Sequence, residues 1–251
     1  MNKVSVIIPT YNRGKHISRA IDSVINQEYS PYEIIVIDDG SSDNTEIILS
    51  HYKNYISYYR NSENIGSQNS RNRGITMSSG DVIAFLDSDD YWRKDKLRLQ
   101  LERANASGNI RDFCVTCGHS LIGNDLPAFR PPETIGLEDI LVHNIVGPTS
   151  NIMMSRSILD AVGLFDPVMP SCQDWELFIR IAQRVPILGV GEVLTFQDTD
   201  SSARISDNHK KVRDGHRAMY RRARATTDFR ALPLAQRWQV RARQELALLR
   251  K

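Results

Sequence analysis

Two aspartates that are two residues apart, Asp87 and Asp89, directly follow a short apolar run at 83–86. A short continuous apolar run is typical of a strand that is buried on both faces of a parallel sheet. Carboxylates at the end of such a strand lie in the crevice where open α/β sheets bind ligands. Because two close carboxylates repel each other, they favour a hard cation such as Mg²⁺ or Mn²⁺. The alternative is an acidic turn that caps a helix starting near Lys94.

Two earlier strands, expected at 4–8 and 33–37, also end in residues that suit a nucleotide. The residues that follow these strands are Pro9, Thr10, Tyr11, Asp38 and Asp39. Because parallel strands share a direction, the three strand ends should meet at one edge of the sheet. That edge offers a ring to stack on a base, carboxylates for a ribose and a cation for a diphosphate. The glycine patterns of dinucleotide-binding and P-loop folds are absent, which disfavours both.

Strands alternate with helices along the chain, roughly every 20–25 residues, which predicts an α/β fold with a mostly parallel sheet. Further strands are expected at 56–59, 81–86, 111–118 and 149–154, and a loop at 124–136. Helices are expected at 17–25, 66–78, 137–143 and 155–162. Another helix should begin at Asp43, with Glu46 at the reciprocal position of a capping box.

The composition is that of a soluble globular protein with one sizeable core: 251 residues, 41% hydrophobic and 25% charged. No run of 18 apolar residues occurs and no signal peptide precedes the first strand. Three cysteines without a secretion signal predict a reduced, cytoplasmic location. Cys114 and Cys117 are three apart in an expected strand, so they should lie on opposite faces as buried thiols rather than form a metal or redox pair.

Four segments of the chain, taken in order, resemble glycosyltransferase family 2. They are VSVIIPTYN at 4–12, IDDGSSDNT at 37–45, NIG at 64–66 with SRN at 70–72, and FLDSDD at 85–90. The resemblance extends over residues 2–200. It implies the GT-A fold, which is a Rossmann-like, mostly parallel sheet flanked by helices. It also implies inverting transfer from a nucleotide-sugar, usually a UDP-sugar, with Mn²⁺ or Mg²⁺.

The resemblance also implies roles for individual residues. Contacts with the nucleotide fall to Pro9, Thr10, Tyr11, Asp39, Asn64 and Arg71. Asp87 would approach the ribose or the metal, and Asp89 would be the direct metal ligand. Each assignment has a structural alternative: Asp39 as a turn cap, Tyr11 packed on its own loop, and Arg71 as a surface residue.

The segment QDWEL at 173–177 resembles the family's Glu-Asp-Trp-Glu-Leu segment, whose Asp is the catalytic base. This implies that Asp174 is the base, while Gln173 departs from the usual acid. A carboxylate can take the proton of an attacking hydroxyl and stabilise positive charge at an oxocarbenium-like centre. The alternative role of Asp174 is a helix N-cap. Trp175 is expected to line the acceptor site.

Many members of the family carry a later His that helps to bind the metal, and the matching region at 195–201 has none. Gln197, Asp198 or His209 could replace it. We assign His209 to the metal together with Asp89, the alternative being a surface His in a mobile loop.

The chain ends in a basic segment: residues 203–251 carry 14 Lys and Arg against 4 Asp and Glu. This segment therefore has a net charge of +10, and because the whole chain has +2, the remainder has −8. Four arginines follow one another at intervals of four, four and three residues, so in a helix they would share one face. An apolar stripe follows on a second expected helix. The arginines are Arg213, Arg217, Arg221 and Arg224, and the stripe is Leu234, Trp238, Ala242, Leu246 and Leu249.

A basic amphipathic helix with a Trp is typical of a segment that lies on a membrane surface. The alternative is that the stripe packs on the catalytic body or on a second subunit. No nucleic-acid motif or aromatic platform accompanies the charge, so a nucleic-acid partner is not expected.

We therefore expect a metal-dependent, inverting glycosyltransferase with a GT-A domain at 1–203 and a basic helical extension at 204–251. The expected acceptor is a lipid-linked saccharide in bacterial surface polysaccharide synthesis, at the inner face of the membrane. A sugar nucleotidyltransferase would need a Gly-rich basic loop after the first strand, and residues 10–15 make a poor one. A non-catalytic nucleotide-sugar-binding protein is the other alternative, against which Asp87, Asp89 and Asp174 argue.

Overall fold

The structure is a computed structural model that describes residues 2–109, 111–123, 126–198 and 209–249. One ten-stranded sheet has the order β3-β2-β1-β4-β9-β6-β10-β5, with β7 paired to β6 and β8 to β10. The strands are β1 (Val4–Thr10), β2 (Glu33–Asp38), β3 (Ser57–Arg60), β4 (Val82–Phe85), β5 (Tyr91–Trp92), β6 (Cys114–Leu121), β7 (Pro127–Phe129), β8 (Thr134–Ile135), β9 (Met153–Ser155) and β10 (Ile187–Gln197).

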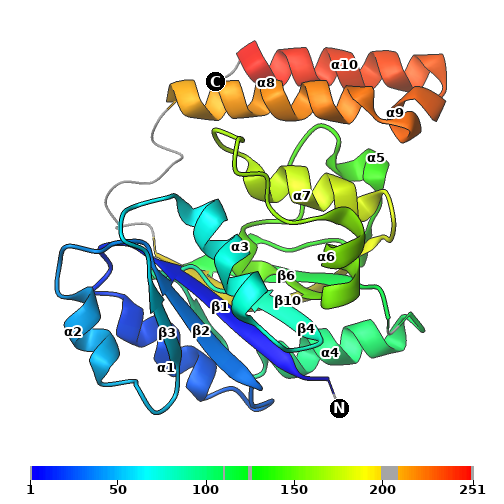
Figure 1. Cartoon of the computed structure of the whole chain (residues 1–251). Helices are drawn as coiled ribbons and strands as arrows, with labels where there is room; N and C mark the ends of the chain where they lie inside the picture. The colour runs from blue at the N-terminus through cyan, green and yellow to red at the C-terminus, as the bar shows by residue number, and fades with distance from the viewer. Residues whose placement is uncertain (1, 110, 124–125, 199–208, 250–251) are drawn as a thin grey trace.

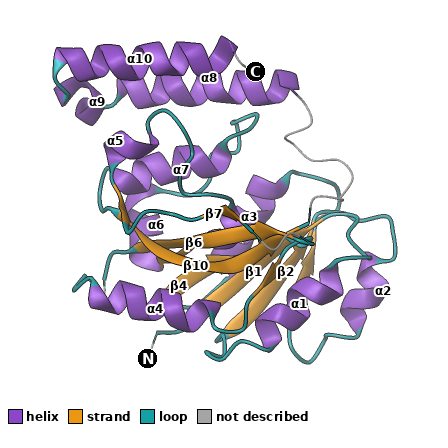
Figure 2. Cartoon of the chain, turned by 180° about the vertical axis from the view of Figure 1, so that it is seen from behind, coloured by secondary structure: helices purple, strands orange, loops and turns teal. Residues whose placement is uncertain are grey.

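Helices cover both faces of this sheet (Figure 2). They are α1 (Ile17–Ile25), α2 (Thr45–Ser50), α3 (Ser67–Met77), α4 (Lys96–Ala106), α5 (Leu137–Ile140), α6 (Arg156–Val162), α7 (Gln173–Ala182), α8 (His209–Ala225), α9 (Thr227–Ala231) and α10 (Leu234–Leu249), with a 3₁₀ turn at Thr149–Asn151. Apolar residues of α1, α2 and α4 join one hydrophobic core. Those of α3 and α5 to α10 join the other. The α/β fold expected from the sequence is confirmed.

The two central cysteines mark the two faces of the sheet. Cys117 belongs to the core under α1 and α4, whereas Cys114 belongs to the core under α6 and α7. Both thiols are buried and free. Burial raises the pKa of both, so the thiolate form that metals and redox chemistry require is disfavoured. The expectation of two structural thiols on opposite faces is confirmed.

Strand direction brings the candidate residues to one edge. β1 runs parallel to β2 and β4, and β6 runs parallel to β10. β9 lies antiparallel between β4 and β6, so β4 and β6 point the same way. The carboxyl ends of β1, β2, β4, β6 and β10 therefore share one edge, which is where open α/β sheets bind ligands.

The capping box expected at the start of α2 is wrong. The N-cap position is Asn44, and its side chain makes no capping hydrogen bond. Asp43 instead accepts hydrogen bonds from the backbone N–H of Thr45 (3.0 Å) and of Gly14 (3.1 Å). Glu46 forms an ion pair with Arg60 on β3. Asp43 thus caps Thr45 locally and also binds Gly14, while Glu46 pairs with Arg60 instead of completing the capping box.

Four strands were not expected from the sequence: β5, β7, β8 and β10. β10 spans 11 residues, but Gly189, Gly191 and Glu192 interrupt its apolar pattern, and its pairing with β6 shifts register after Val190. β7 and β8 lie within the expected loop at 124–136. The strand expected at 149–154 is a 3₁₀ turn followed by β9.

The three C-terminal helices form a layer on top of α5 and α7, with α10 outermost (Figure 1). Met219, Tyr220, Ala223 and Phe229 are the buried residues with which this layer joins the second core. Within the described residues, no helix is long and apolar enough to cross a membrane.

Candidate active site

The carboxylate of Asp39 organises the loop that faces the end of β2. It accepts hydrogen bonds from Nδ2 of Asn61 (2.7 Å), from the backbone N–H of Ile65 (3.0 Å) and from that of Gly66 (2.8 Å). Gly66 has a φ of +91°, a conformation that favours glycine. Asn64, a predicted nucleotide contact, accepts a hydrogen bond from the N–H of Gly66 (3.2 Å) in the same loop.

The end of β1 offers a ring and an unpartnered hydroxyl. Pro9 is buried inside the strand, and Tyr11 is 43% exposed just beyond it. Oγ1 of Thr10 is buried and has no hydrogen-bond partner in the described part of the chain. A buried polar atom without a partner usually receives one from water or a ligand. Tyr11 is exposed as a base-stacking role requires, and Thr10 has hydrogen-bonding capacity to spare.

Arg71 and Asp87 form an ion pair at the centre of this edge. Arg71 is only 8% exposed, so the alternative that it is a surface residue is wrong. Its guanidinium also lies over the ring of Phe165, at 5.7 Å from the centroid. The backbone N–H of Asp87 donates to Oγ of Ser150 (3.0 Å), which holds the end of β4 against the second half of the chain.

A second group of charges surrounds Asp89. Its Oδ2 lies 3.4 Å from Nε of Arg13, and its backbone carbonyl accepts a hydrogen bond from Arg19 (2.6 Å). Arg19 also binds Oδ2 of Asp198 (2.7 Å), and Nδ1 of His16 lies 3.4 Å from the same oxygen. Asp198, one of the three residues proposed to replace the missing metal His, thus shares Arg19 with the backbone of Asp89.

These acids fit a divalent cation that substrate phosphates help to hold. Burial raises the pKa of Asp90 well above its usual range, and the charges of Asp87 and Asp89 raise it further. Such crowding of carboxylate oxygens favours a hard cation. Among the described residues, no group of three or more His, Cys, Asp or Glu is placed to hold an ion. The side chain of His209 and residues 199–201 lie outside the described part.

Asp174 lies in the first turn of α7, two residues after the N-cap Cys172, so it is not the N-cap itself. Burial raises the pKa of its carboxyl; Arg71 opposes this shift and the charge of Asp87 adds to it. Asp174 is therefore near enough to the Arg71–Asp87 pair to be influenced by both charges. Nδ2 of Asn144 lies 3.4 Å from Oδ2 of Asp174. Gln173, which stands where the family segment usually has an acid, is buried, and its Nε2 donates to the carbonyl of Met169 (3.2 Å).

The expectation that Trp175 lines the acceptor site is wrong. The side chain is 3% exposed, and its Nε1 donates to the carbonyl of Ile140 (2.7 Å). Its ring packs edge-on against Tyr220 of α8, with the ring centroids 5.7 Å apart. Trp175 therefore anchors α7, because successive residues of a helix point in different directions: Asp174 faces the site and Trp175 faces the core.

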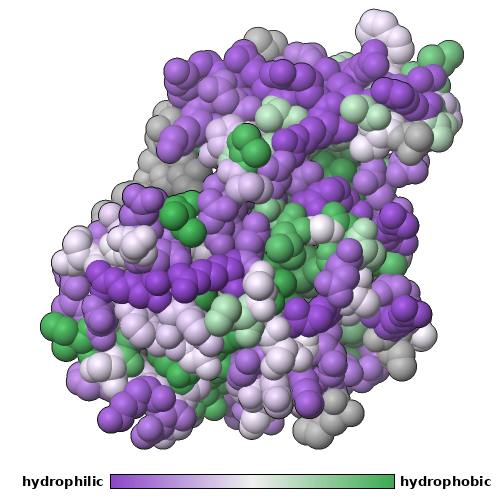
Figure 3. All heavy atoms as spheres, in the orientation of Figure 1, coloured by the Kyte–Doolittle hydropathy of each residue, from purple (hydrophilic) through white to green (hydrophobic). Residues whose placement is uncertain are grey.

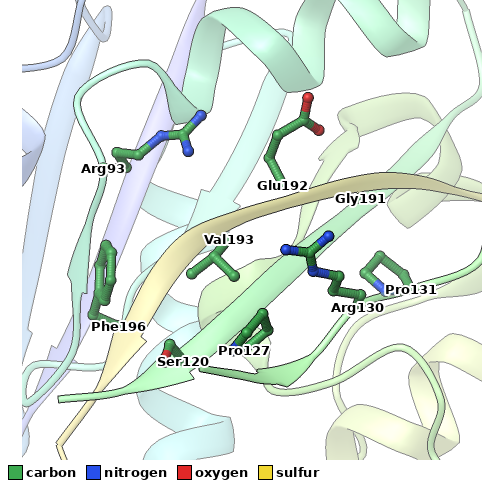
Figure 4. Close-up of a pocket in the computed structure, with 9 residues that line it drawn as sticks. All are labelled: Arg93, Ser120, Pro127, Arg130, Pro131, Gly191, Glu192, Val193 and Phe196. Carbon is green, nitrogen blue, oxygen red and sulfur yellow. The ribbon is translucent and has the colours of Figure 1, made fainter. Parts of the chain in front are cut away.

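A separate cavity of about 810 Å³ lies along β10 (Figure 4). Arg93 and Arg130 extend toward it from different sides, and Val193 and Phe196 line it from β10. None of the residues predicted from the sequence lines this cavity. Among the predicted site residues, Pro9, Thr10, Asp39, Asp87 and Asp89 lie instead at or just beyond the ends of β1, β2 and β4.

The structure adds site residues that sequence reasoning missed. They are Arg13, Arg19, Asn144 and Ser150. Asn144 had a weak signal, since an Asn three residues before Gly147-Pro148 is typical of a turn. The other three had no signal, because their partners are 60 to 76 positions away in the chain, at Asp89, Asp90 and Asp87.

The protein-family model described as glycosyl transferase family 2 matches residues 5–163. Among curated proteins, the Escherichia coli UDP-Glc:α-D-GlcNAc-diphosphoundecaprenol β-1,3-glucosyltransferase WfgD is 33% identical over 161 residues, which is 62% of each chain. The chain spans between 36% and 66% of the length of several curated relatives that it matches.

Two solved structures share the fold. The 1–349 fragment of Staphylococcus aureus TarS in complex with UDP-GlcNAc superposes with a TM-score of 0.75 at 21% identity, over 95% of this chain and 70% of that fragment. The mannosyltransferase PcManGT of Pyrobaculum calidifontis, in complex with GDP-Man and Mn²⁺, gives 0.71 at 17% identity, over 98% and 71% of the two chains.

Proposed function

Because the chain belongs to glycosyl transferase family 2, we propose that it transfers a hexosyl unit from a nucleotide-sugar to a hydroxyl of a glycan acceptor, with inversion. The observation that carries this proposal is the Arg71–Asp87 ion pair at the carboxyl edge of the sheet, and the charges of both residues act on the carboxyl of Asp174. In this proposal a base from the second half of the chain faces a donor edge built by the first half. A donor carbon held between them has a leaving group on one side and a base on the other.

The proposed donor is a UDP-sugar. Tyr11 would stack on the base, Thr10 and the loop held by Asp39 and Asn64 would contact the nucleoside, and Arg71 with Asp87 would lie at the ribose and phosphates. The buried Nε of Arg71 has no hydrogen-bond partner in the described residues, as expected for a group with a ligand to bind. WfgD is named for UDP-Glc, which supports the choice of nucleotide.

The proposed metal is Mn²⁺ or Mg²⁺, held by Asp89 with Asp87 beside it, and a bound ion would neutralise the departing diphosphate. Asp198 adjoins the same group of charges and is proposed as a further ligand, while the proposed role of His209 concerns a side chain outside the described residues. Two protein carboxylates suffice for such a site, because Mg²⁺ usually keeps waters and substrate phosphates as its other ligands.

Asp174 is the proposed base. Its carboxylate takes the proton of the acceptor hydroxyl as that oxygen bonds to the sugar carbon and the bond to the nucleotide breaks. Arg71 favours the ionised form of Asp174, which offsets part of the effect of burial. A positioned base of this kind contributes about 10²–10⁴-fold to the rate.

The acceptor that we propose is a lipid-linked saccharide, reached from the membrane surface through the extension at 204–251. WfgD is named for a diphosphoundecaprenol-linked acceptor. On α10, Leu234, Trp238 and Leu246 are 70%, 74% and 54% exposed, so this stripe does not pack on the catalytic body. Exposed Arg241 and Arg243 lie on the same helix, and the visible face of the layer is largely hydrophilic (Figure 3). Apolar side chains beside arginines suit an anionic lipid surface.

The test is binding and transfer with UDP-, GDP- and dTDP-sugars in Mn²⁺ or Mg²⁺, using wild type, Asp89→Ala and Asp174→Asn. Asp160→Asn, an exposed acid on α6, is the matched control. We expect metal-dependent binding of a UDP-sugar that Asp89→Ala weakens, and turnover that Asp174→Asn abolishes without loss of binding. Absence of binding by every donor would overturn the donor site. Donor binding without turnover would instead favour a non-catalytic sensor.

A further inference from the structure

We propose that Asn144 positions the catalytic base, and that the C-terminal helical hairpin of α8 and α10 holds Asn144 in place. This inference rests on the proposed role of Asp174. It assigns a catalytic purpose to contacts between segments that are 78 to 103 positions apart in the chain.

The amide of Asn144 has one possible orientation. Its Oδ1 accepts hydrogen bonds from the backbone N–H groups of Val146 (3.0 Å) and Gly147 (3.2 Å). Its Nδ2 donates to the carbonyl of Gly147 (3.1 Å), and the same NH₂ group makes the long 3.4 Å contact with Oδ2 of Asp174. Because the oxygen is committed to the turn, the NH₂ group must face the carboxylate. Such hydrogen bonds are often long before substrate binds and shorten afterwards.

The loop that carries Asn144 is tied to the hairpin by two buried hydrogen bonds. Oη of Tyr220 on α8 donates to the carbonyl of Val142 (2.9 Å). Nε2 of Gln244 on α10 donates to the carbonyl of Leu141 (2.7 Å). Gln244 is fully buried and Tyr220 is 2% exposed, so neither bond competes with solvent. Hydrogen bonds of this kind fix the path of the loop up to Asn144.

The same hairpin holds the helix that carries the base. Trp175, the neighbour of Asp174, packs edge-on against His216 and Tyr220, at centroid distances of 5.3 and 5.7 Å. Oγ of Ser171 donates to the carbonyl of Lys211 on α8 (3.0 Å). The two segments that meet at the Asn144–Asp174 contact are thus held by the same hairpin, which lies over α5 and α7 in Figure 1.

Contact with an amide donor favours the ionised carboxylate. The charged groups that act on Asp174 are Arg71 of α3 and Asp87 at the end of β4. His216 of α8 packs on its neighbour Trp175. The backbone N–H groups of Trp175 and Asp174 also favour the ionised carboxylate. Removing the amide of Asn144 takes away one further donor, so the pKa of Asp174 should rise and its carboxylate should lose one of the contacts that fix its direction.

The test compares Asn144→Ala and Gln244→Ala with Gln236→Ala, a matched control on the exposed side of α10. We measure kcat, the KM and Kd for a UDP-sugar, the pH profile of kcat, and the pKa of Asp174 in the free protein by carboxyl NMR. In Asn144→Ala we expect kcat to fall about tenfold, unchanged donor Kd, and an acid limb moved to higher pH. Gln244→Ala should also lower kcat and move the acid limb to higher pH, in each case by less than Asn144→Ala.

Two results separate this inference from the proposed function. If Asp174→Asn retains full turnover, the base assignment fails and this inference fails with it. If Asp174→Asn is inactive but Asn144→Ala keeps the wild-type kcat, pH profile and carboxyl pKa, only the positioning role is overturned. A fall in donor affinity equal to the fall in kcat would also overturn it, because that result describes general disorder of the site.

Discussion

Nε of Arg13 lies 3.4 Å from Oδ2 of Asp89, so the carboxylate proposed to bind the metal is already paired with a cation of the protein. Both side chains are 18% exposed. A metal that binds Asp89 must therefore displace or share this partner. An ion pair of this kind contributes about 0–1 kcal/mol, which corresponds to at most roughly a fivefold change in affinity.

We predict that Arg13→Gln tightens the binding of Mn²⁺ to the donor-free protein by about two- to fivefold. The reason is that the variant loses the positive charge that competes with the ion. Calorimetry or electron paramagnetic resonance of Mn²⁺ checks it, with the exposed Arg111→Gln as control. Equal affinity in Asp89→Asn and wild type would show that the ion binds elsewhere.

The second prediction concerns the stability of the base variant. The pKa of Asp174 is raised in the folded protein from an ordinary 3.8, chiefly by burial. The protonated form is therefore favoured by folding, and this stabilisation is lost as pH rises through the folded pKa. Asp174→Asn should accordingly be more stable than wild type at neutral pH and equally stable near pH 4. Thermal melts from pH 4 to 8 measure this. A variant that melts lower at every pH contradicts the account.

The third prediction concerns the loop held by Asp39. Its carboxylate accepts three hydrogen bonds, and in Asp39→Asn the new NH₂ group faces at least one N–H donor. Hydrogen bonds to a charged group contribute about 1.5–3 kcal/mol each, so both stability and donor affinity should fall. We expect at least a tenfold loss of UDP-sugar binding. Asp22→Asn, which weakens one exposed contact to Tyr52, should leave binding unchanged.

The fourth prediction concerns a buried lysine far from the site. Burial lowers the pKa of Lys96 to about 8, and its Nζ donates to Oε1 of Gln100 (2.7 Å). Between that value and the ordinary lysine pKa of 10.5 the unfolded chain binds more protons than the folded chain, so this group should make stability rise with pH in this window. Burial of Cys114 and Cys117 acts in the opposite direction in this window, so the prediction is for a difference between variants. In urea unfolding, the stability of wild type relative to Lys96→Met should rise by roughly 1–2 kcal/mol between pH 7.5 and 9.5. The exposed Lys53→Met should differ from wild type by the same amount at both pH values.

The fifth prediction concerns α10. If its exposed stripe lies on lipid, Trp238→Ser should reduce binding to vesicles that contain phosphatidylglycerol by about tenfold, since burying a large apolar side chain contributes about 1.5–3 kcal/mol. Ile47→Ser on α2, where the side chain is 66% exposed, is the matched control. Wild type should bind neutral phosphatidylcholine vesicles weakly, and raised salt should weaken binding. Equal loss in both variants would refute a specific role for α10.

The sequence by itself determined the order of the main elements and the edge at which they end. Apolar runs and helical spacing are local, and parallel strands share a direction, so Asp39, Asp87 and Asp89 had to meet at one edge. The opposite facing of Cys114 and Cys117 followed in the same way from the two-residue period of a strand. The resemblance of four short segments to those of the family could also be recognised from the sequence alone, because each segment is contiguous.

Only the tertiary structure decided which groups touch at that edge and what the last helices cover. Arg71 was as plausible on the surface as in the site, and Trp175 as plausible in the acceptor site as in the core. Asn144 became a candidate because Tyr220 and Gln244, 78 and 103 positions after the carbonyls that they bind, hold its loop. The stripe on α10 faces outward because Gln244 and Val240 occupy the inward face. Such contacts join residues that no local period relates, so their geometry exists only once the sheet and both helical layers have packed.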